Sequence, residues 1–281
     1  MSNLAEKIRH EVTCAIDNDE LELPTLPEVA LRIRDAAEDP EVSVQGLARV
    51  IAEDAGLSGR MIKVANSPLY RGANSIEDLN MAMSRLGVAF AANLAIGMAM
   101  EQMFQATSDL VDRKLRQVWG HATEVAGISA VLAKRFTRLR PDQAALAGLT
   151  HSVGVLPIVA WAERHPNLLA DGMTLDGVIE RIHGALGTTI LASWEFADEI
   201  ARVPAQYADF ERAAPEADYA DVVMVANLYT LAGTEHPYTQ LDWSRIHAFT
   251  NLALDPSLES SELTELADDI AAASEAFGAG G

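Results

Sequence analysis

The stretch TLDGVIERIHGALGTTI, residues 174–190, decides the fold class. Its large apolar residues follow one another three or four positions apart: Leu175, Ile179, Ile182, Leu186 and Ile190. This spacing places them on one face of an α-helix, and Thr174 is suited to cap its first turn. The same period recurs along almost the whole chain, whereas no run alternates as a half-buried strand does. The sequence therefore predicts an all-α protein.

Further helices are predicted on both sides of this segment. Ser43 and Ser75 are expected to cap two of them, and Gly87 is expected to end the second. The prolines in LPTLP, residues 23–27, exclude a helix there, and residues 171–172 indicate a turn. The predicted helices cover about residues 2–18, 28–40, 43–51, 57–65, 75–87, 88–104, 108–136, 141–151 and 216–231.

The long helix that begins near residue 108 sets the expected domain organisation. We expect an N-terminal helical lobe of residues 1–107 and a second helical lobe of residues 108–258, in extensive contact. Residues 259–281 are predicted to form an acidic amphipathic helix and a disordered end, since apolar residues such as Leu266, Ile270 and Phe277 keep helical spacing there. Packing of this helix on its own domain is favoured over docking to a partner.

Charge and composition limit the partners. The formal net charge is −20, which repels nucleic acid and anionic membranes, so neither is expected as a partner. The single cysteine, Cys14, forms no internal disulfide, and we interpret it as a small apolar helix residue. The most apolar stretch, residues 88–100, is too short to span a bilayer, and the N-terminus has no signal-peptide pattern. A cytoplasmic location is expected.

Residues 43–66 have the pattern of a helix-turn-helix, with a glycine turn at Gly56. A DNA-reading second helix needs several side chains that reach bases and phosphates. Here Arg49, Arg60 and Lys63 stand against Glu53 and Asp54, so the hairpin is barely positive. We favour an ordinary helix hairpin. DNA binding stays an alternative that the surface charge of this hairpin decides.

Two histidines carry the main chemical interest. His121 follows Trp119-Gly120 inside the long helix, and His151 ends the next helix in GLTHSVG, residues 148–154. Two such histidines on facing helices supply half of a metal site. From spacing alone, buried and hydrogen-bonded core histidines are the favoured interpretation. Walker, nucleophile-elbow, His-Glu-x-x-His and dinucleotide-binding motifs are absent.

Taken together, the motifs between about Leu23 and Ala232 resemble the HDOD domain family, a branch of the HD superfamily of metal-dependent phosphohydrolases. The matching segments occur in the family's order: residues 23–27, 51–57, 64–67, Tyr70, 75–76, Ala82, 86–87, 119–121, 148–151, Glu180, His183, Gly187, Leu191 and Trp194. The sequence departs from the family at Ala55, where proline is usual, and at residues 206–207, where a histidine pair is frequent.

The resemblance implies a two-lobed helical HDOD/HD-like fold and a degenerate HD site. HD phosphohydrolases use a His, a His-Asp pair and a later Asp. His121 and His151 match the histidines, but Ser152 replaces the paired Asp, and Asn227 matches the last one, with Asp221 as the alternative. Neutral side chains cannot hold a hydrolytic divalent metal. We therefore expect no metal, no cofactor and no catalysis, as in a pseudoenzyme of the superfamily.

The expected function is that of a non-catalytic bacterial signal-transduction module acting by protein–protein interaction. Histidine kinases, response regulators and cyclic-dinucleotide enzymes are the expected partner classes. The candidate interaction loop contains Asn66, Ser67, Tyr70 and Arg71, in a corner where Asn66 is expected to cap the preceding helix; a purely structural corner is the alternative. The rival function is a divergent metal-dependent phosphohydrolase acting on a nucleotide or cyclic dinucleotide.

Overall fold

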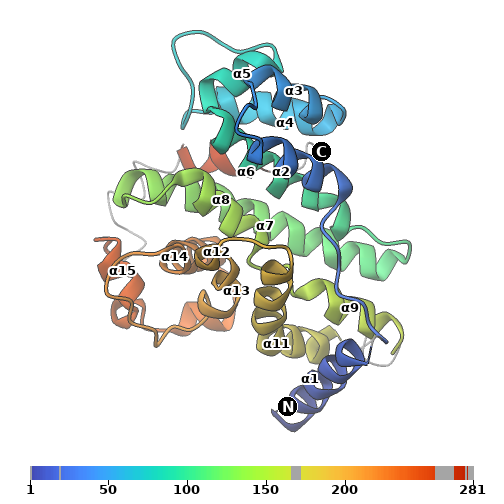
Figure 1. Ribbon diagram of the computed structural model, residues 1–281. Coiled ribbons are helices and arrows are strands. Elements are labelled where there is room, and N and C mark those ends of the chain that lie inside the picture. Colours follow the sequence, from blue (N-terminus) through green and yellow to red (C-terminus); the bar gives the residue numbers. More distant parts are fainter. Residues whose placement is uncertain (1, 19, 166–171, 257–268, 276, 278–281) are drawn as a thin grey trace.

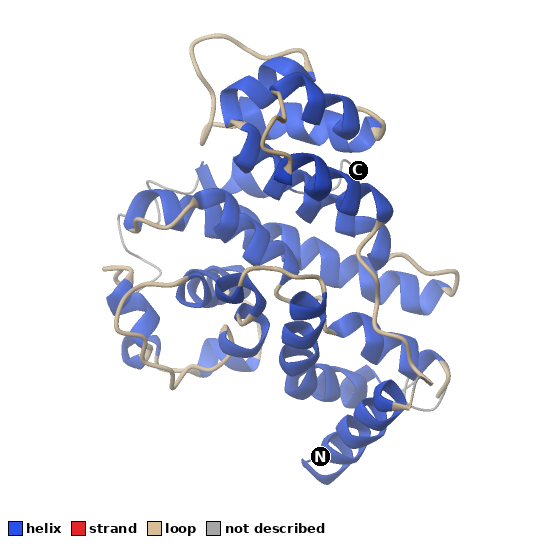
Figure 2. Ribbon diagram, in the orientation of Figure 1, coloured by secondary structure: helices blue, strands red, loops and turns tan. Residues whose placement is uncertain are grey.

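The fold is known from a computed structural model that describes residues 2–18, 20–165, 172–256, 269–275 and 277. Within these ranges the ordered elements are helices, and no strand occurs (Figure 2). The predicted all-α class is therefore confirmed.

The helices up to residue 104 form the upper part of the molecule, except for α1, which lies at the opposite end beside α11 and α9 (Figure 1). Their bounds are α1 Ser2–Asp17, α2 Glu28–Glu38, α3 Val44–Ile51, α4 Ala55–Asn66, α5 Leu79–Leu86, α6 Val88–Ala99 and the 3-10 helix η1 Met100–Phe104.

The later helices include the long α7, which packs along α8 through the middle of the molecule (Figure 1). Their bounds are α7 Asp109–Phe136, α8 Pro141–Thr150, α9 Val155–Glu163, α11 Gly172–Ser193, α12 Asp198–Ala201, α13 Val203–Gln206, α14 Tyr219–Leu231, η2 Pro237–Gln240, η3 Trp243–Arg245 and α15 His247–Asn251.

The first residues of α3 and α5 show which of the predicted capping residues cap a helix. Ser43 caps α3, its Oγ accepting from the Gly46 N–H at 3.0 Å. Ser75 does not cap α5: Asp78 does, because its carboxylate accepts from the Met81 N–H at 2.9 Å. Gly87 ends that helix with a φ of +83°, a conformation that suits glycine.

The start of α11 also differs from the prediction. This helix already includes Gly172, so Thr174 lies inside it and does not cap it, and Gly172 is helical, not part of a turn. Residue 171, the other residue of the predicted turn, lies outside the described residues.

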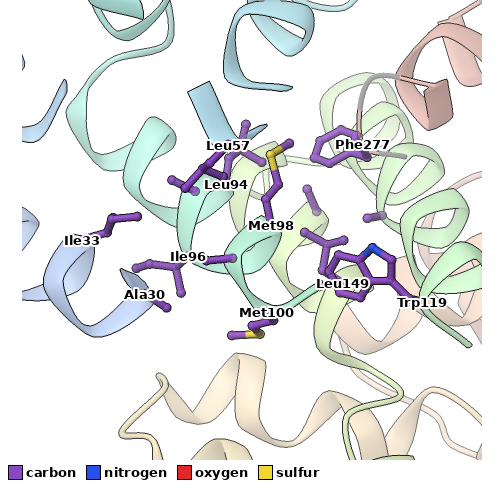
Figure 3. Packing of buried hydrophobic residues seen from close by; sticks show 14 of the residues in the cluster. Ala30, Ile33, Leu57, Leu94, Ile96, Met98, Met100, Trp119, Leu149 and Phe277 are labelled. Carbon is purple, nitrogen blue, oxygen red and sulfur yellow. The ribbon is translucent and has the colours of Figure 1, made fainter. Parts of the chain in front are cut away.

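The main hydrophobic cluster draws buried residues from both sides of residue 107. Ile33, Leu57 and Leu94 come from the N-terminal side, and Trp119 and Leu149 from α7 and α8 (Figure 3). The division into lobes at residue 107 stays a prediction. The core shows that α6 and α7 both pack against α8 and that all three helices contribute to one hydrophobic cluster.

The described part of the C-terminal segment packs on its own chain. Ala273 and Phe277 are buried in the main cluster, and Asp269 forms an ion pair with Arg135 of α7 at 2.7 Å. A Cβ on Gly127 of α7 would lie 2.6 Å from the backbone nitrogen of Ser274, so the segment sits directly on that helix. The rest of the predicted C-terminal helix, and the disordered end, lie outside the described residues.

Among the described residues, the helical stretch that comes nearest to a membrane span is Pro141–Glu163; residues 88–100, the most apolar stretch of the sequence, were expected to be too short. It is long and apolar enough to cross a bilayer, but 94% of its apolar window is buried inside the protein. The pair α5 and α6 passes the same test only if counted as one span, despite a bend of 115° between the two helices. Burial of this kind is what a core helix shows.

Candidate functional site

Three of the four predicted HD positions meet in space, although they come from different helices. His121 lies in the middle of α7, His151 directly follows α8, and Asn227 lies in α14. His121 Nε2 is 2.8 Å from Asn227 Oδ1, and the rings of His121 and His151 are 5.8 Å apart between centroids. The side chains of His151 and Asn227 are buried, and that of His121 is half-buried.

The hydrogen bond to Asn227 fixes how His121 can act. An amide oxygen only accepts, so the Nε2 of His121 carries the proton in this arrangement. A ring nitrogen that carries a proton has no in-plane lone pair with which to bind a metal. Asn227 thereby occupies this nitrogen of His121 at the position where the resemblance to HD enzymes predicts a carboxylate.

His151 is held as a neutral imidazole. Its Nδ1 donates to the carbonyl oxygen of Gly148 at 2.6 Å. Burial, together with the neighbouring His121, lowers the pKa of His151 to about 3. Since nothing near it offers a negative charge to offset its desolvation, the ring stays uncharged in the folded protein at neutral pH.

A second pair of side chains extends the site on the far side of His151. Tyr207, which follows α13, packs edge-on against His151 with ring centroids 4.8 Å apart. Its hydroxyl donates to Nε2 of His183, in α11, at 2.7 Å. His183 in turn donates from Nδ1 to the carbonyl oxygen of Ile179 at 2.6 Å. Burial lowers the pKa of His183 and raises that of Tyr207, so both are neutral.

Asp221 takes no part in this cluster. It is buried, forms an ion pair with Arg212, and accepts from Nδ2 of Asn251 at 2.7 Å. Burial is the largest influence on Asp221 and raises its pKa, against the opposing effect of these partners. Of the two alternatives for the last HD position, the geometry therefore places Asn227, and not Asp221, beside His121.

The donor set does not fit a hydrolytic divalent metal. The side chains at the four HD positions are two imidazoles, an amide and a hydroxyl, none of them anionic, and the hydroxyl of Ser152 is buried without a hydrogen-bond partner. The nearby Glu180 is exposed and interacts with Tyr238. In the part of the chain that the structure describes, no group of three His, Cys, Asp or Glu side chains could hold a metal ion. Cations of this kind need anionic oxygen ligands.

The predicted interaction loop turns three of its four side chains inward. Asn66 does not cap α4: its amide donates to the carbonyl oxygen of Ile76 at 2.7 Å and accepts from the Ile76 N–H at 2.8 Å. This pair of hydrogen bonds links the two ends of the loop across ten residues. Ser67 is buried and donates to Val64 O at 2.8 Å. Tyr70 packs edge-on against Phe90 at 4.9 Å, and only Arg71 is fully exposed.

Two of the three cations in the helix hairpin of residues 43–66 are offset by carboxylates, whereas Arg49 is exposed and has no ion-pair partner among the described residues. Arg60 forms an ion pair with Glu101, and Lys63 lies 3.7 Å from Glu275. Next to the hairpin's turn, Glu53 pairs with Arg32 of α2. A DNA-reading helix keeps such cations available for phosphates. These ion pairs speak against that role.

Comparison with known proteins agrees with this geometry. The model of the HDOD domain matches residues 23–210, which is most of the chain. The chain belongs to the HDOD domain family. The matched range contains His121, His151 and Ser152 and ends before Asn227, so the last HD position rests on the contact with His121.

Several solved structures resemble this HDOD protein along its whole length. A protein of Shewanella amazonensis SB2B with the provisional name metal-dependent phosphohydrolase is 30% identical, with a TM-score of 0.85 over 99% of this chain and 100% of that one. An HDOD domain protein of unknown function from Geobacter sulfurreducens is 23% identical, with a TM-score of 0.63 over 99% of both chains. The HD-like helical fold is thereby confirmed.

Two further relatives differ in length from this chain. A protein of Marinobacter aquaeolei VT8, provisionally named a signal transduction protein, is 22% identical with a TM-score of 0.62, over 97% of this chain and 65% of its own. An uncharacterized protein of Treponema pallidum (strain Nichols) is 28% identical over 153 residues, which is 53% of this chain. The chain spans 28% of the length of that curated relative.

Proposed function

We propose that this HDOD protein is a non-catalytic module of bacterial signal transduction that acts by binding other proteins, and that its HD site is a degenerate relic. The observation that carries the proposal is the bond between His121 Nε2 and Asn227 Oδ1. It supports a site in which an amide has replaced the carboxylate that a metal would need and has closed onto the metal-binding nitrogen.

The rest of the cluster supports a structural role for the same residues. His151 donates to Gly148 O, and His183 accepts from Tyr207. These hydrogen bonds help to hold helices α7, α8, α11 and α14 together. Buried polar groups that are paired in this way help to specify one arrangement of helices. The name of the Marinobacter relative adds an association with signalling in that protein.

The test restores the missing charges. The double variant Ser152→Asp/Asn227→Asp places carboxylates at both degenerate positions, so it should gain binding of Mn²⁺ that the natural chain lacks, measured by calorimetry and elemental analysis. Adding His151→Ala to the double variant should abolish the gain. The control Asn18→Asp/Ser84→Asp adds the same charge at two exposed positions and should gain nothing.

One result overturns the proposal directly. If the natural chain holds about one divalent ion per molecule and loses it on His151→Ala, the site is a working metal centre. The rival function is then a metal-dependent phosphohydrolase, which the name of the Shewanella relative favours. Release of phosphate from nucleotides, or cleavage of cyclic dinucleotides, by that metal-loaded chain would establish it.

A further inference from the structure

The loop after α4 meets the C-terminal end of α7 in a corner that gathers positive charge. Lys134 of α7 donates to the carbonyl oxygen of Leu69, and its Nζ lies 5.1 Å from the centre of the Tyr70 ring. The next residue of the loop, Arg71, is exposed. In Figure 1 this loop and the start of α8 lie on the same side of the molecule.

Two more cations belong to the same surface. Arg85 of α5 donates to Asn74 O at 2.7 Å, and its guanidinium lies 3.3 Å from where a Cβ on Gly72 would be. Arg140 precedes α8 and pairs with Asp142 at 2.6 Å, and the charge of Asp142 acts on Tyr70. We call these four residues the basic corner: Arg71, Arg85, Lys134 and Arg140.

Three of the four cations of the basic corner have no carboxylate partner among the described residues. The chain as a whole is acidic, with 41 acidic and 21 basic residues, so such a local group of cations differs from the average surface. In the described residues, Arg85 and Lys134 bond only to backbone carbonyls, and Arg71 has no ion-pair partner. Two carboxylates adjoin the corner: Asp142 is buried and shared between Arg140 and Asn93, and Asp269 pairs with Arg135 and also acts on Lys134.

The loop is also rigid enough to present this charge in one arrangement. The two-way bond between Asn66 and Ile76 fixes its base, and Tyr70 anchors its middle against Phe90. Burial lowers the pKa of Lys134, and the adjacent Arg135 adds to that effect. The charged form of Lys134 is therefore disfavoured in the free protein, and a bound carboxylate would stabilise it. Preorganised cations of this kind bind anions with little loss of conformational entropy.

We propose that the basic corner is a docking site for an acidic segment of a partner protein, read by Arg71 together with Lys134, Arg85 and Arg140. The proposal rests on the proposed function, since it names the surface and the partner chemistry of the binding module. A short acidic segment fits better than a nucleic acid. An extended polyanion would also meet the surrounding surface of a chain with net charge −20, whereas a segment of a few residues meets only the corner.

The probe for the test is a fluorescein-labelled decapeptide of Glu and Asp alternating with Gly and Ser. The natural chain should bind it at low salt, with affinity falling as salt rises. Arg71→Glu should weaken binding at least tenfold at unchanged melting temperature, because Arg71 is exposed and has no partner in the described chain. Arg113→Glu, at an exposed position of α7 far along the helix from Lys134, should change affinity less than twofold.

Equal loss in the two variants, or no binding by the natural chain, would show that the basic corner is not an acidic-segment site. Tighter binding of a ten-nucleotide single-stranded DNA than of the peptide, lost in Arg71→Glu, would reassign the corner to nucleic acid and overturn the proposal. The metal measurement on His151→Ala is independent of both results. A metal-loaded, hydrolytic natural chain with intact peptide binding would therefore refute the proposed function alone.

Discussion

His121 and Asn227, 106 positions apart in the sequence, are joined by a hydrogen bond of 2.8 Å between Nε2 and Oδ1. The bond links α7 to α14, with Asn227 only 3% exposed and His121 half-buried. Asn227→Ala should lower the free energy of unfolding by about 1–3 kcal/mol, because the imidazole N–H is left unpaired. Urea unfolding at pH 7 measures this loss.

A double-mutant cycle separates this bond from general packing. His121→Ala combined with Asn227→Ala should cost less than the sum of the single variants, with a coupling of about 1 kcal/mol. Thr230→Val removes a neighbouring hydroxyl that bonds only to Asn227 O at 2.7 Å, and it should leave the coupling unchanged. Additive single effects would mean that the two side chains do not stabilise each other.

Burial of His151 predicts a dependence of stability on pH. Its pKa is lowered to about 3 in the folded protein, below the ordinary value of 6.5, mainly by desolvation. Between these values the unfolded chain binds the proton and the folded chain does not, so stability rises with pH across that window and is lost on acidification. From pH 7 to pH 5, His151 alone should remove about 2 kcal/mol.

A variant without the imidazole separates the contribution of His151 from that of the other titrating groups. His151→Asn lacks the titrating group, so its unfolding free energy should fall less steeply between pH 7 and pH 5 than that of the natural chain. The pKa of His183 is lowered in the same direction by burial, so part of the slope should remain in this variant. Parallel pH profiles of the two proteins would show that His151 is not the group responsible.

The helical period predicted elements such as α1, α7 and α14 to within a few residues, because an apolar face repeats whatever the tertiary context. The caps were less predictable. Ser75 and Asp78 are both suitable residues three positions apart, and only the path of the loop after Ile76 decides for Asp78. Likewise, nothing local shows that Asn66 bonds to a residue ten positions away.

The site was predictable only where a resemblance supplied the spacing. His121 and His151 are unremarkable as separate helical histidines, and Asn227 was distinguished from Asp221 only by what each contacts. Asp221 is taken by Arg212, nine residues earlier, in a pairing that no sequence period indicates. Tyr207 departs from the histidine that is frequent in the family, yet its ring packs against His151 and its hydroxyl donates to His183. This departure from the family pattern is the sequence feature that could have pointed to Tyr207 as part of the site.

Tyr70 tests whether the corner after α4 is structural. Its ring contacts Phe90 and Lys134, while its hydroxyl is buried without a hydrogen-bond partner. Tyr70→Ala should lower the free energy of unfolding by about 3 kcal/mol through lost packing. Tyr70→Phe keeps the ring and removes the unpaired hydroxyl, so it should be neutral or more stable by up to about 1 kcal/mol. A Tyr70→Phe loss as large as that of Tyr70→Ala would reveal a role for the hydroxyl instead.

Gly154, two residues after Ser152, sets how closely the end of the His151 segment approaches α11. A Cβ at this position would lie 1.9 Å from the carbonyl oxygen of His183 and 2.5 Å from the nitrogen of Gly187, both backbone atoms that cannot step aside. Gly154→Ala should therefore force the two segments apart and cost about 3 kcal/mol or more in unfolding free energy. Because His183 moves with its carbonyl, its bond to Tyr207 should weaken as well, which the imidazole signals of an NMR spectrum would report.

Gly120 provides the matched control for this substitution. It lies in α7 beside His121, is exposed, and has no atom within 4 Å of the place that a Cβ would occupy. Gly120→Ala should raise the unfolding free energy by about 0.5–1 kcal/mol, since alanine is the better helix former. The same change from glycine to alanine is thus expected to lower the unfolding free energy at Gly154 and to raise it at Gly120. Similar destabilisation by both variants would show that the close contact at Gly154 does not hold α11 in place.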